Sequence, residues 1–269
     1  MFKRLLQKFK IKKFYHTGLQ NTLHFGCDTI SYPIKNNFCE IICITFNNPA
    51  LLKLQSSLIQ KYIKGSYNFT IADNSTDLKY RKELALICKN ENIGYISLPI
   101  NPYKNGSQSH AAAINWVVRN YLTFKKPSYF GFIDHDIFPI ESFEPSFHLN
   151  KQSVYGLLQQ REPYWYLWAG FSFFKYGTFD IKQMDFMPGT LSGINLDTGG
   201  MNWKLIYSNL KRENLVFPLQ TYKNLREGEI FQSDKMEIIG SWLHSFNGSY
   251  WMKVEKKEHL LEEYLQQYL

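Results

Sequence analysis

The sequence predicts an α/β fold in which helices flank a mostly parallel sheet. Short apolar runs without polar alternation recur through residues 38–140, and such runs are typical of strands covered on both faces. Segments with helical spacing of apolar residues separate them, and a regular strand–helix alternation favours right-handed βαβ units. With 269 residues, of which 44% are hydrophobic, the chain is long enough for one large domain or one domain with a small appendage.

Four strands and three helices are expected in the first part of the chain. FCEIICITF at 38–46 is a continuous β-type run, and the early Pro49 that follows suits the first turn of a helix. The expected elements, in order, are a strand at 38–46, a helix at 49–63, a strand and turn at 67–77, a helix ending at 90, a strand at 93–100, a helix at 111–124 and a strand at 129–138.

The second part changes in character. Residues 151–203 are rich in glycine and aromatic residues, which suggests strands and loops over the rim of the sheet. MEIIGSWLHSFNGSYW at 236–251 predicts a closing strand and loop, and the last residues predict an amphipathic helix that caps the domain or pairs with another subunit; we expect capping. The predicted organisation is a basic leader and loop at 1–37, a main domain at 38–251 with halves at 38–140 and 141–251, and a C-terminal helix at 252–269.

The formal charge of +8 favours anionic partners, and part of it is concentrated in MFKRLLQKFKIKKF at 1–14. Basic and apolar residues alternate there in a pattern that suits a short helix lying on anionic lipid. A solvated helix docked on the domain is the alternative, and the sequence leaves both open. Charges interrupt every possible apolar core of a secretory signal, and no window reaches the roughly 18 apolar residues of a membrane span.

The four cysteines show no CxxC spacing, and Cys39 and Cys43 are expected in the core, not in a zinc site. We therefore expect reduced thiols and a cytoplasmic protein, with possible peripheral contact at the cytoplasmic membrane face through residues 1–14.

Two aspartates one residue apart close the fourth predicted strand, in YFGFIDHDIF. Ligands of open α/β sheets bind beyond the carboxyl ends of the strands, so polar residues that follow each strand converge on one rim. Asp134 and Asp136 share that rim with polar residues at 47–48, 73–77 and 101–110. Oxygen ligands from alternate residues can approach one divalent ion, so a metal site is expected there; a surface turn or a buried polar network is the alternative.

Four stretches of the first part resemble the nucleotide-sugar-binding half of GT-A glycosyltransferases, particularly the family 2-like group. They are, in order, ITFNNP, IADNSTD, the loop NPYKNGSQSH and FIDHD. The resemblance covers roughly residues 38–140. It implies a GT-A fold with the catalytic domain at 38–251 and a DXD metal motif. The second half departs from the commonest family 2 pattern because it has no Glu-Asp pair, which leaves the catalytic base open.

The resemblance implies that Thr45, Phe46 and Asn47 line the nucleotide pocket and that Asp73 accepts hydrogen bonds from the base or ribose. A turn cap with Asn74 and Ser75 is the alternative role of Asp73. Gln108, Ser109 and His110 would precede the helix at 111–124, whose N-terminal amides favour a phosphate. His110 either contacts the ligand or caps that helix.

The resemblance further implies that Asp134 and Asp136 hold Mn²⁺ or Mg²⁺ on the sugar diphosphate, the first also reaching the ribose. A late histidine often returns to the metal in such enzymes, and His244 matches it; a core histidine is the alternative. The tryptophans Trp168, Trp203, Trp242 and Trp251 offer a sugar-stacking face, although at least half of them are expected in the core.

For the general base, Asp197 in GINLDTGGMNW is the candidate, with a turn aspartate as its alternative, and Glu162 in QQREPYW is the weaker candidate.

The predicted function is a metal-dependent transferase of polysaccharide synthesis that moves a sugar from a nucleoside diphosphate donor, UDP- ahead of GDP- or dTDP-, to a glycan or glycolipid hydroxyl, with inversion. The late HSFNGSYW is similar to a motif of retaining GT-A enzymes, which keeps retention open. A nucleotidyltransferase is less favoured because NNPALL has no glycine and no basic residue before Lys53. A non-enzymatic binder of nucleic acid or lipid is less favoured because basic residues beyond the leader are dispersed, so nucleic acid is not an expected partner.

Overall fold

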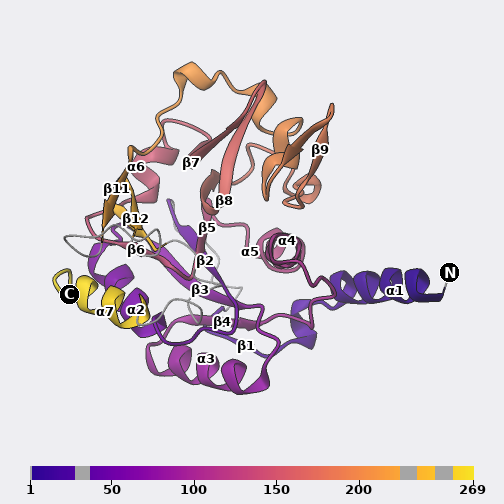
Figure 1. The fold of residues 1–269 in the computed structure, drawn as a ribbon, viewed down its shortest axis with the longest axis horizontal. Helices are drawn as coiled ribbons and strands as arrows, with labels where there is room; N and C mark the ends of the chain where they lie inside the picture. The colour runs from indigo at the N-terminus through magenta and orange to yellow at the C-terminus, as the bar shows by residue number, and fades with distance from the viewer. Residues whose placement is uncertain (1, 28–36, 225–234, 246–256) are drawn as a thin grey trace.

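A computed structural model describes residues 2–27, 37–224, 235–245 and 257–269 (Figure 1). The helices are α1 (Phe2–His16), α2 (Leu52–Tyr62), α3 (Leu78–Asn90), α4 (Gly106–Val117), the π-helical turn η2 (Val118–Leu122), α5 (Thr123–Lys125), α6 (Pro145–Leu149) and α7 (Lys257–Gln266). Single 3-10 turns are η1 (Leu19–Asn21), η3 (Ile181–Gln183), η4 (Gly200–Trp203), η5 (Tyr207–Asn209) and η6 (Arg212–Asn214).

The described strands form three sheets. The central sheet, in the order β1-β4-β3-β2-β5-β8-β7, contains β1 (His24–Phe25), β2 (Cys39–Thr45), β3 (Tyr67–Asp73), β4 (Gly94–Ser97), β5 (Tyr129–Asp134), β7 (Val154–Arg161) and β8 (Tyr164–Lys175). The second sheet, in the order β11-β12-β13-β6, contains β6 (Ile137–Pro139), β11 (Gln220–Asn224), β12 (Lys235–Ile239) and β13 (Trp242–His244). The third pairs β9 (Gly189–Leu191) with β10 (Ile194–Leu196).

Parallel pairing joins β4, β3, β2 and β5, the four strands that the sequence predicts, with helices between them. The α/β fold class is therefore confirmed. Three antiparallel strands extend this parallel centre: β1 on one edge, β8 and β7 on the other. Because β1 pairs with β4, part of the predicted leader and loop at 1–37 belongs to the sheet.

Alternate side chains of the central strands enter two different cores, as a doubly covered sheet requires. Ile42 and Phe132 face the cluster that contains α4, whereas Ile41 and Ile133 face the cluster that contains α2 and α3. Asp134 continues the series of Phe132 by two residues, so its side chain lies on the α4 face of the sheet. This parity decides which helix the carboxylate meets.

The predicted strand at 129–138 is two strands. β5 ends at Asp134, residues 135–136 turn, and Ile137–Pro139 pairs with β13 in the second sheet. The predicted helix at 111–124 likewise begins earlier, at Gly106, and continues through the π-helical turn and α5 to Lys125. Both differences bear on the site below.

The predicted closing strand at 236–251 folds as β12 and β13 with a turn at Gly240, and the rest of it lies outside the described residues. In the terminal helix α7, Leu261 and Leu265 are fully buried against α2 and the second sheet, which agrees with capping. All four cysteines are buried and free. Of the described helices, none has the length and apolar character needed to cross a bilayer.

Candidate active site at the carboxyl ends of the parallel strands

The loops that follow β2, β3 and β4 are tied together by side-chain hydrogen bonds. Asn47, after β2, accepts from the backbone N–H of Thr76 at 3.1 Å and donates its own N–H to Ser75 Oγ at 2.8 Å. Asn74, after β3, donates to Ser109 Oγ at 3.0 Å and accepts from Asn101 at 2.9 Å. The predicted rim therefore exists as a cross-linked layer of polar loops.

Asp73 takes the turn role on this rim. It is fully buried; one oxygen accepts from the Ser75 N–H at 2.8 Å and the other from the Tyr95 hydroxyl at 2.7 Å. A ribose would have to displace these internal partners, so the structure does not favour the predicted contact with base or ribose. Thr45 is buried, whereas Phe46 is 40% exposed at the rim, where a flat ligand could pack on its ring.

The first turn of α4 also faces the rim. Asn105 caps it, because its side chain accepts from the Gln108 N–H at 3.1 Å and its carbonyl from the Ser109 N–H at 2.8 Å. His110 lies one turn inside the helix, not at the cap, which removes the capping alternative for this residue. Its imidazole is left to face the sheet.

His110 and Asp134 form a close pair across the α4 face, with 2.9 Å between Nε2 and Oδ1. Burial alone would lower the pKa of His110, but the charges of Asp134, Asp197 and Asp136 outweigh burial and raise its pKa above 6.5. Burial alone would raise the pKa of Asp134, but His110, with lesser contributions from His135 and His244, holds that pKa below 3.8. The pair therefore favours imidazolium and carboxylate.

A β-bulge in β8 of the β7–β8 hairpin lies beside Asp134. Gly156 pairs with Ser172 and Leu158 with Leu167, so β8 has extra residues at 168–171. Gly170, in this bulge, has no room for a side chain: an added Cβ would lie 2.7 Å from Asp134 Oδ2 and 2.4 Å from the Trp168 ring. Glycine thus permits the carboxylate and the indole to approach the same strand.

The second sheet brings His244 to Asp136. β13 pairs with β6 so that His244 lies opposite Ile137, and the Ser245 N–H donates to the Asp136 carbonyl at 2.9 Å. His244 Nε2 lies 3.8 Å from Asp136 Oδ2, and the Trp168 ring packs on the imidazole with 4.8 Å between centroids. The predicted return of His244 to the acidic pair is therefore present as a spatial arrangement.

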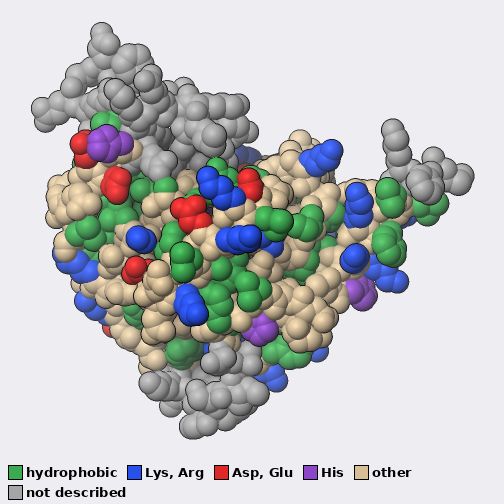
Figure 2. All heavy atoms as spheres, turned by 90° about the horizontal axis from the view of Figure 1, so that it is seen from below, with side chains coloured by type: hydrophobic (Ala, Val, Ile, Leu, Met, Phe, Trp, Pro, Cys, Tyr) green, Lys and Arg blue, Asp and Glu red, His purple; other side chains and the backbone are tan. Residues whose placement is uncertain are grey.

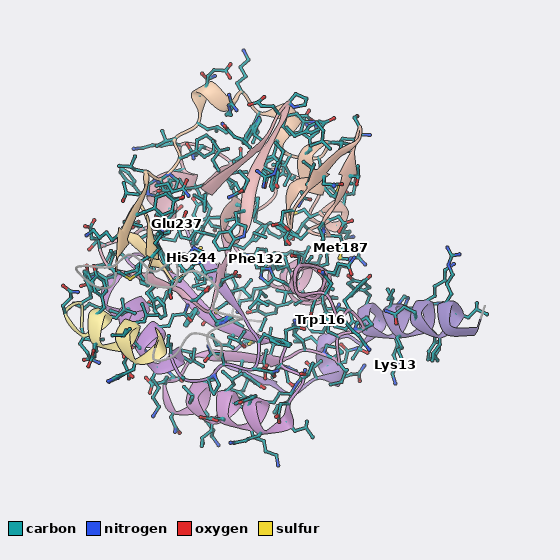
Figure 3. All side chains as sticks on the ribbon, in the orientation of Figure 1. Lys13, Trp116, Phe132, Met187, Glu237 and His244 are labelled. Atoms are coloured by element: carbon teal, nitrogen blue, oxygen red, sulfur yellow. The ribbon has the colours of Figure 1, made fainter. Side chains whose placement is uncertain are left out.

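Glu237 holds this histidine from behind, and the sequence analysis did not identify it. It lies directly opposite His244 in the β12–β13 ladder, is 2% exposed, and its Oε2 lies 2.7 Å from His244 Nδ1 (Figure 3). Its other oxygen accepts from Gln220. A carboxylate only accepts, so in the neutral imidazole the proton belongs on Nδ1, and Nε2 faces Asp136. An isolated glutamate in the apolar run MEIIG was the available sequence signal.

Burial alone would lower the pKa of His244, but Asp136 and Glu237 outweigh it, and the pKa is raised above 6.5. Neighbouring ligands of an octahedral ion lie about 3.0 Å apart when each is about 2.1 Å from it, so Nε2 and Oδ2, at 3.8 Å, would have to approach each other slightly to share a cation. Within the described residues, no group of three or more His, Cys, Asp or Glu side chains is placed so that it could hold a metal ion, so Asp136 and His244 offer two protein ligands at most. Oxygens of a ligand or water would have to complete the coordination.

Asp197 follows β10 and is exposed. Its backbone N–H donates to the Tyr166 hydroxyl at 3.0 Å, and its Oδ1 accepts from the Thr198 N–H at 2.8 Å. Its negative charge contributes, after that of Asp134 and together with that of Asp136, to the raised pKa of His110. The following Gly199 has φ +94°, and a Cβ there would lie 2.9 Å from the Leu167 carbonyl oxygen. Glycine is therefore needed for this loop to pack against β8.

Glu162 does not belong to this cluster. It lies at the tip of the β7–β8 hairpin, its side chain is 77% exposed, and its nearest ionic partner is Arg212 at 3.8 Å. Tyr164 pairs with Arg161 at the end of the β7–β8 hairpin, whereas Phe171, further along β8, is the partner of Ile133 beside the site. The weaker candidate base is thus too distant in this structure.

Of the four tryptophans, Trp242 is in the core, Trp203 packs on Tyr164 and Trp165, and Trp168 alone lies against a site residue; Trp251 falls outside the described residues. Trp168 is therefore the candidate aromatic wall of the site.

The chain matches no protein-family model and no curated protein. Solved structures similar to it include an active-site mutant of LgtC, at 15% identity and a TM-score of 0.39 over 54% of this chain and 61% of that one. They also include apo WbbM, described as a bifunctional glycosyltransferase, at 11% identity and a TM-score of 0.35 over 86% of this chain and 36% of that one. The chain spans less than two thirds of either structure, and superpositions below a TM-score of 0.5 do not establish an activity.

The His110–Asp134 pair predicts a pH response of the metal-free protein. A raised imidazole pKa stabilises the fold below pH 6.5, and this stabilisation is lost as pH rises through the folded-state pKa. NMR titration of His110, assigned with His110→Gln, should give a pKa above 6.5 in the wild type and a lower one in Asp134→Asn. Equal values in the two proteins would contradict the pairing.

The Glu237–His244 contact predicts the imidazole tautomer. In the metal-free protein, ¹⁵N NMR at a pH above the His244 pKa should place the proton on Nδ1, because Glu237 only accepts. Glu237→Gln retains an acceptor and should keep this tautomer, whereas Glu237→Leu should lose it. The same tautomer in the leucine variant would show that Glu237 does not orient the ring.

Proposed function

We propose that this protein is a metal-dependent glycosyltransferase that moves one sugar from a nucleoside diphosphate donor to a hydroxyl of a glycan or glycolipid, as in polysaccharide synthesis. One observation carries the proposal: Asp134, Asp136, His110, Asp197 and His244, from four separate segments, act on one another at the carboxyl ends of a parallel sheet. Open α/β sheets bind their ligands at this edge.

The chain's own residues supply donor recognition. Phe46 offers a partly exposed ring for the base, and Asn47 anchors the loop beside it. The first turn of α4 presents the positive end of the helix dipole, and His110 adds a positive charge in its protonated form. Such a surface favours a diphosphate over a neutral ligand.

Asp136 and His244 would hold Mn²⁺ or Mg²⁺, with Asp134 beside them, because a carboxylate oxygen and an imidazole nitrogen suit either ion. A cation bound there would neutralise the negative charge on the departing nucleoside diphosphate. Glu237 orients His244 toward that position, and Trp168 packs on the imidazole.

Asp197 would act as general base on the acceptor hydroxyl. Its Oδ1 is held by the Thr198 N–H, which fixes the carboxylate, and the side chain remains open to solvent, where an acceptor hydroxyl could reach it. A single displacement assisted by this base inverts the anomeric centre. In the same proposal, the donor is a UDP-sugar in preference to a GDP- or dTDP-sugar. The enzyme acts on the cytoplasmic side of the membrane and contacts it peripherally through residues 1–14.

Donor turnover tests this function directly. Nucleoside diphosphate release should be detected from UDP-, GDP- or dTDP-sugars in the presence of Mn²⁺ and should be lost with a chelator. Asp136→Asn should lower kcat/KM by at least about 100-fold. Loss of a residue that only hydrogen-bonds a metal ligand costs up to about 100-fold, and loss of a ligand itself should cost at least as much.

Asp180→Asn is the matched control, since asparagine caps η3 as well as aspartate does, and it should turn over normally. Release that is independent of metal, or an Asp136→Asn enzyme of full activity, would refute the metal-dependent mechanism.

The base assignment predicts the stereochemistry. With an α-linked donor, NMR of the product should show the β-anomer, and Asp197→Asn should lower transfer by roughly 10²–10⁴-fold, the usual contribution of a general base. Net retention of configuration would exclude Asp197 as the base.

A further inference from the structure

Helix α1 is attached to the domain by one of its faces only. Phe14 is 2% exposed within the α4 core, and the carbonyl of Thr17, just after the helix, accepts from Trp116 Nε1 at 2.9 Å. Nearer its start, Gln7 donates to the Pro102 carbonyl at 2.9 Å. Figure 3 places Trp116 beside the docked end of the helix, and Figure 1 shows the rest of α1 extending from the body.

The opposite face is apolar and uncovered. Leu5, Leu6 and Phe9 are 60%, 45% and 64% exposed. At 3.6 residues per turn these three side chains fall within an arc of about 100°, on the side opposite Gln7 and Phe14. The helix thus has two apolar faces, and the domain uses only one.

Cations border this uncovered face, and the sequence of α1 contains no acidic residue. Its described basic residues are Arg4, Lys8, Lys10, Lys12 and Lys13, all exposed. Figure 2 shows blue and green side chains next to one another along the projecting helix, with no red on that face. Lysine stems can lie along apolar surface while their ammonium groups reach anionic groups.

We propose that α1 lies in the interface of an anionic bilayer, with Leu5, Leu6 and Phe9 inserted among the lipids and its lysines on the headgroups. Apolar insertion together with cation–headgroup attraction is the combination that holds an interfacial helix. A second copy is a poorer occupant, because packing two such faces together would oppose five cations on each helix. Nucleic acid would pair with the cations but leave the leucines in water.

The contact would also position the active-site rim. Trp116, which contacts the end of α1, and His110, which faces Asp134, lie six residues apart on α4, about 9 Å along the axis. One rigid helix therefore joins the lipid-binding element to the rim. A lipid-linked acceptor, which rests on the proposed function, is the substrate that this arrangement would serve.

Sedimentation with vesicles tests the contact in the full-length protein. The wild type should bind phosphatidylcholine vesicles containing phosphatidylglycerol at least about tenfold more tightly than pure phosphatidylcholine vesicles, and binding should weaken as salt rises. The variant Leu5→Ser/Leu6→Ser/Phe9→Ser should lose at least about tenfold in affinity. A control, Leu78→Ser/Leu86→Ser/Leu219→Ser, alters exposed side chains elsewhere on the body and should bind as the wild type does.

Equal vesicle binding by the wild type and the α1 variant would overturn the proposal, as would equal binding to neutral and anionic vesicles. Tighter binding to generic RNA than to anionic vesicles would overturn it in favour of nucleic acid. A dimer seen by analytical ultracentrifugation and lost in the α1 variant would overturn it in favour of a second copy. Donor release in solution should be unchanged in the α1 variant, so failure of vesicle binding and failure of the proposed function are separate results.

Discussion

The site depends on how two aspartates are kept at the end of a buried strand. Unpaired buried carboxylates are costly, and here each one faces a histidine from a different element: His110 at 2.9 Å from Asp134, and His244 at 3.8 Å from Asp136. Charge balance therefore links the central sheet to α4 on one side and to the second sheet on the other. The arrangement of the rim follows from satisfying these two charges.

The second sheet has a defined part in this balance. Its strand β6 leaves β5 immediately after the acidic pair, and β13 returns beside it, so the backbone ladder itself delivers His244. Gln220, Glu237 and His244 form a row of polar contacts across β11, β12 and β13 toward Asp136. A row that crosses strands is rigid because each member is held by the pleat as well as by its neighbour.

Helix α1 follows a different logic. Its docked end is fixed by Phe14 and Trp116, whereas its exposed apolar face gains nothing from the domain. An apolar stripe bordered by cations is costly to keep in water unless a partner covers it. The same helix α4 receives α1 and carries His110, so the element that binds α1 also contributes to the charge balance of the rim.

The sequence by itself determined the parallel centre of the sheet, since continuous apolar runs and helical spacing are local signals, and it located Asp134 and Asp136 at the carboxyl edge. The place of His244 was implied only by the family resemblance, with a core histidine as the alternative. Only the tertiary structure decided which candidates share that edge. Glu162 lies at a distant hairpin tip, because strand length and register have no local signature. The turn contact of Asp73 with Ser75 is local and was an open alternative, whereas only the pairing of β3 with β4 brings the Tyr95 hydroxyl to its other oxygen. Glu237 could not be identified from the sequence for a similar reason. Its partner His244 is seven residues away, and only the register of the β12–β13 hairpin places the two side chains opposite each other.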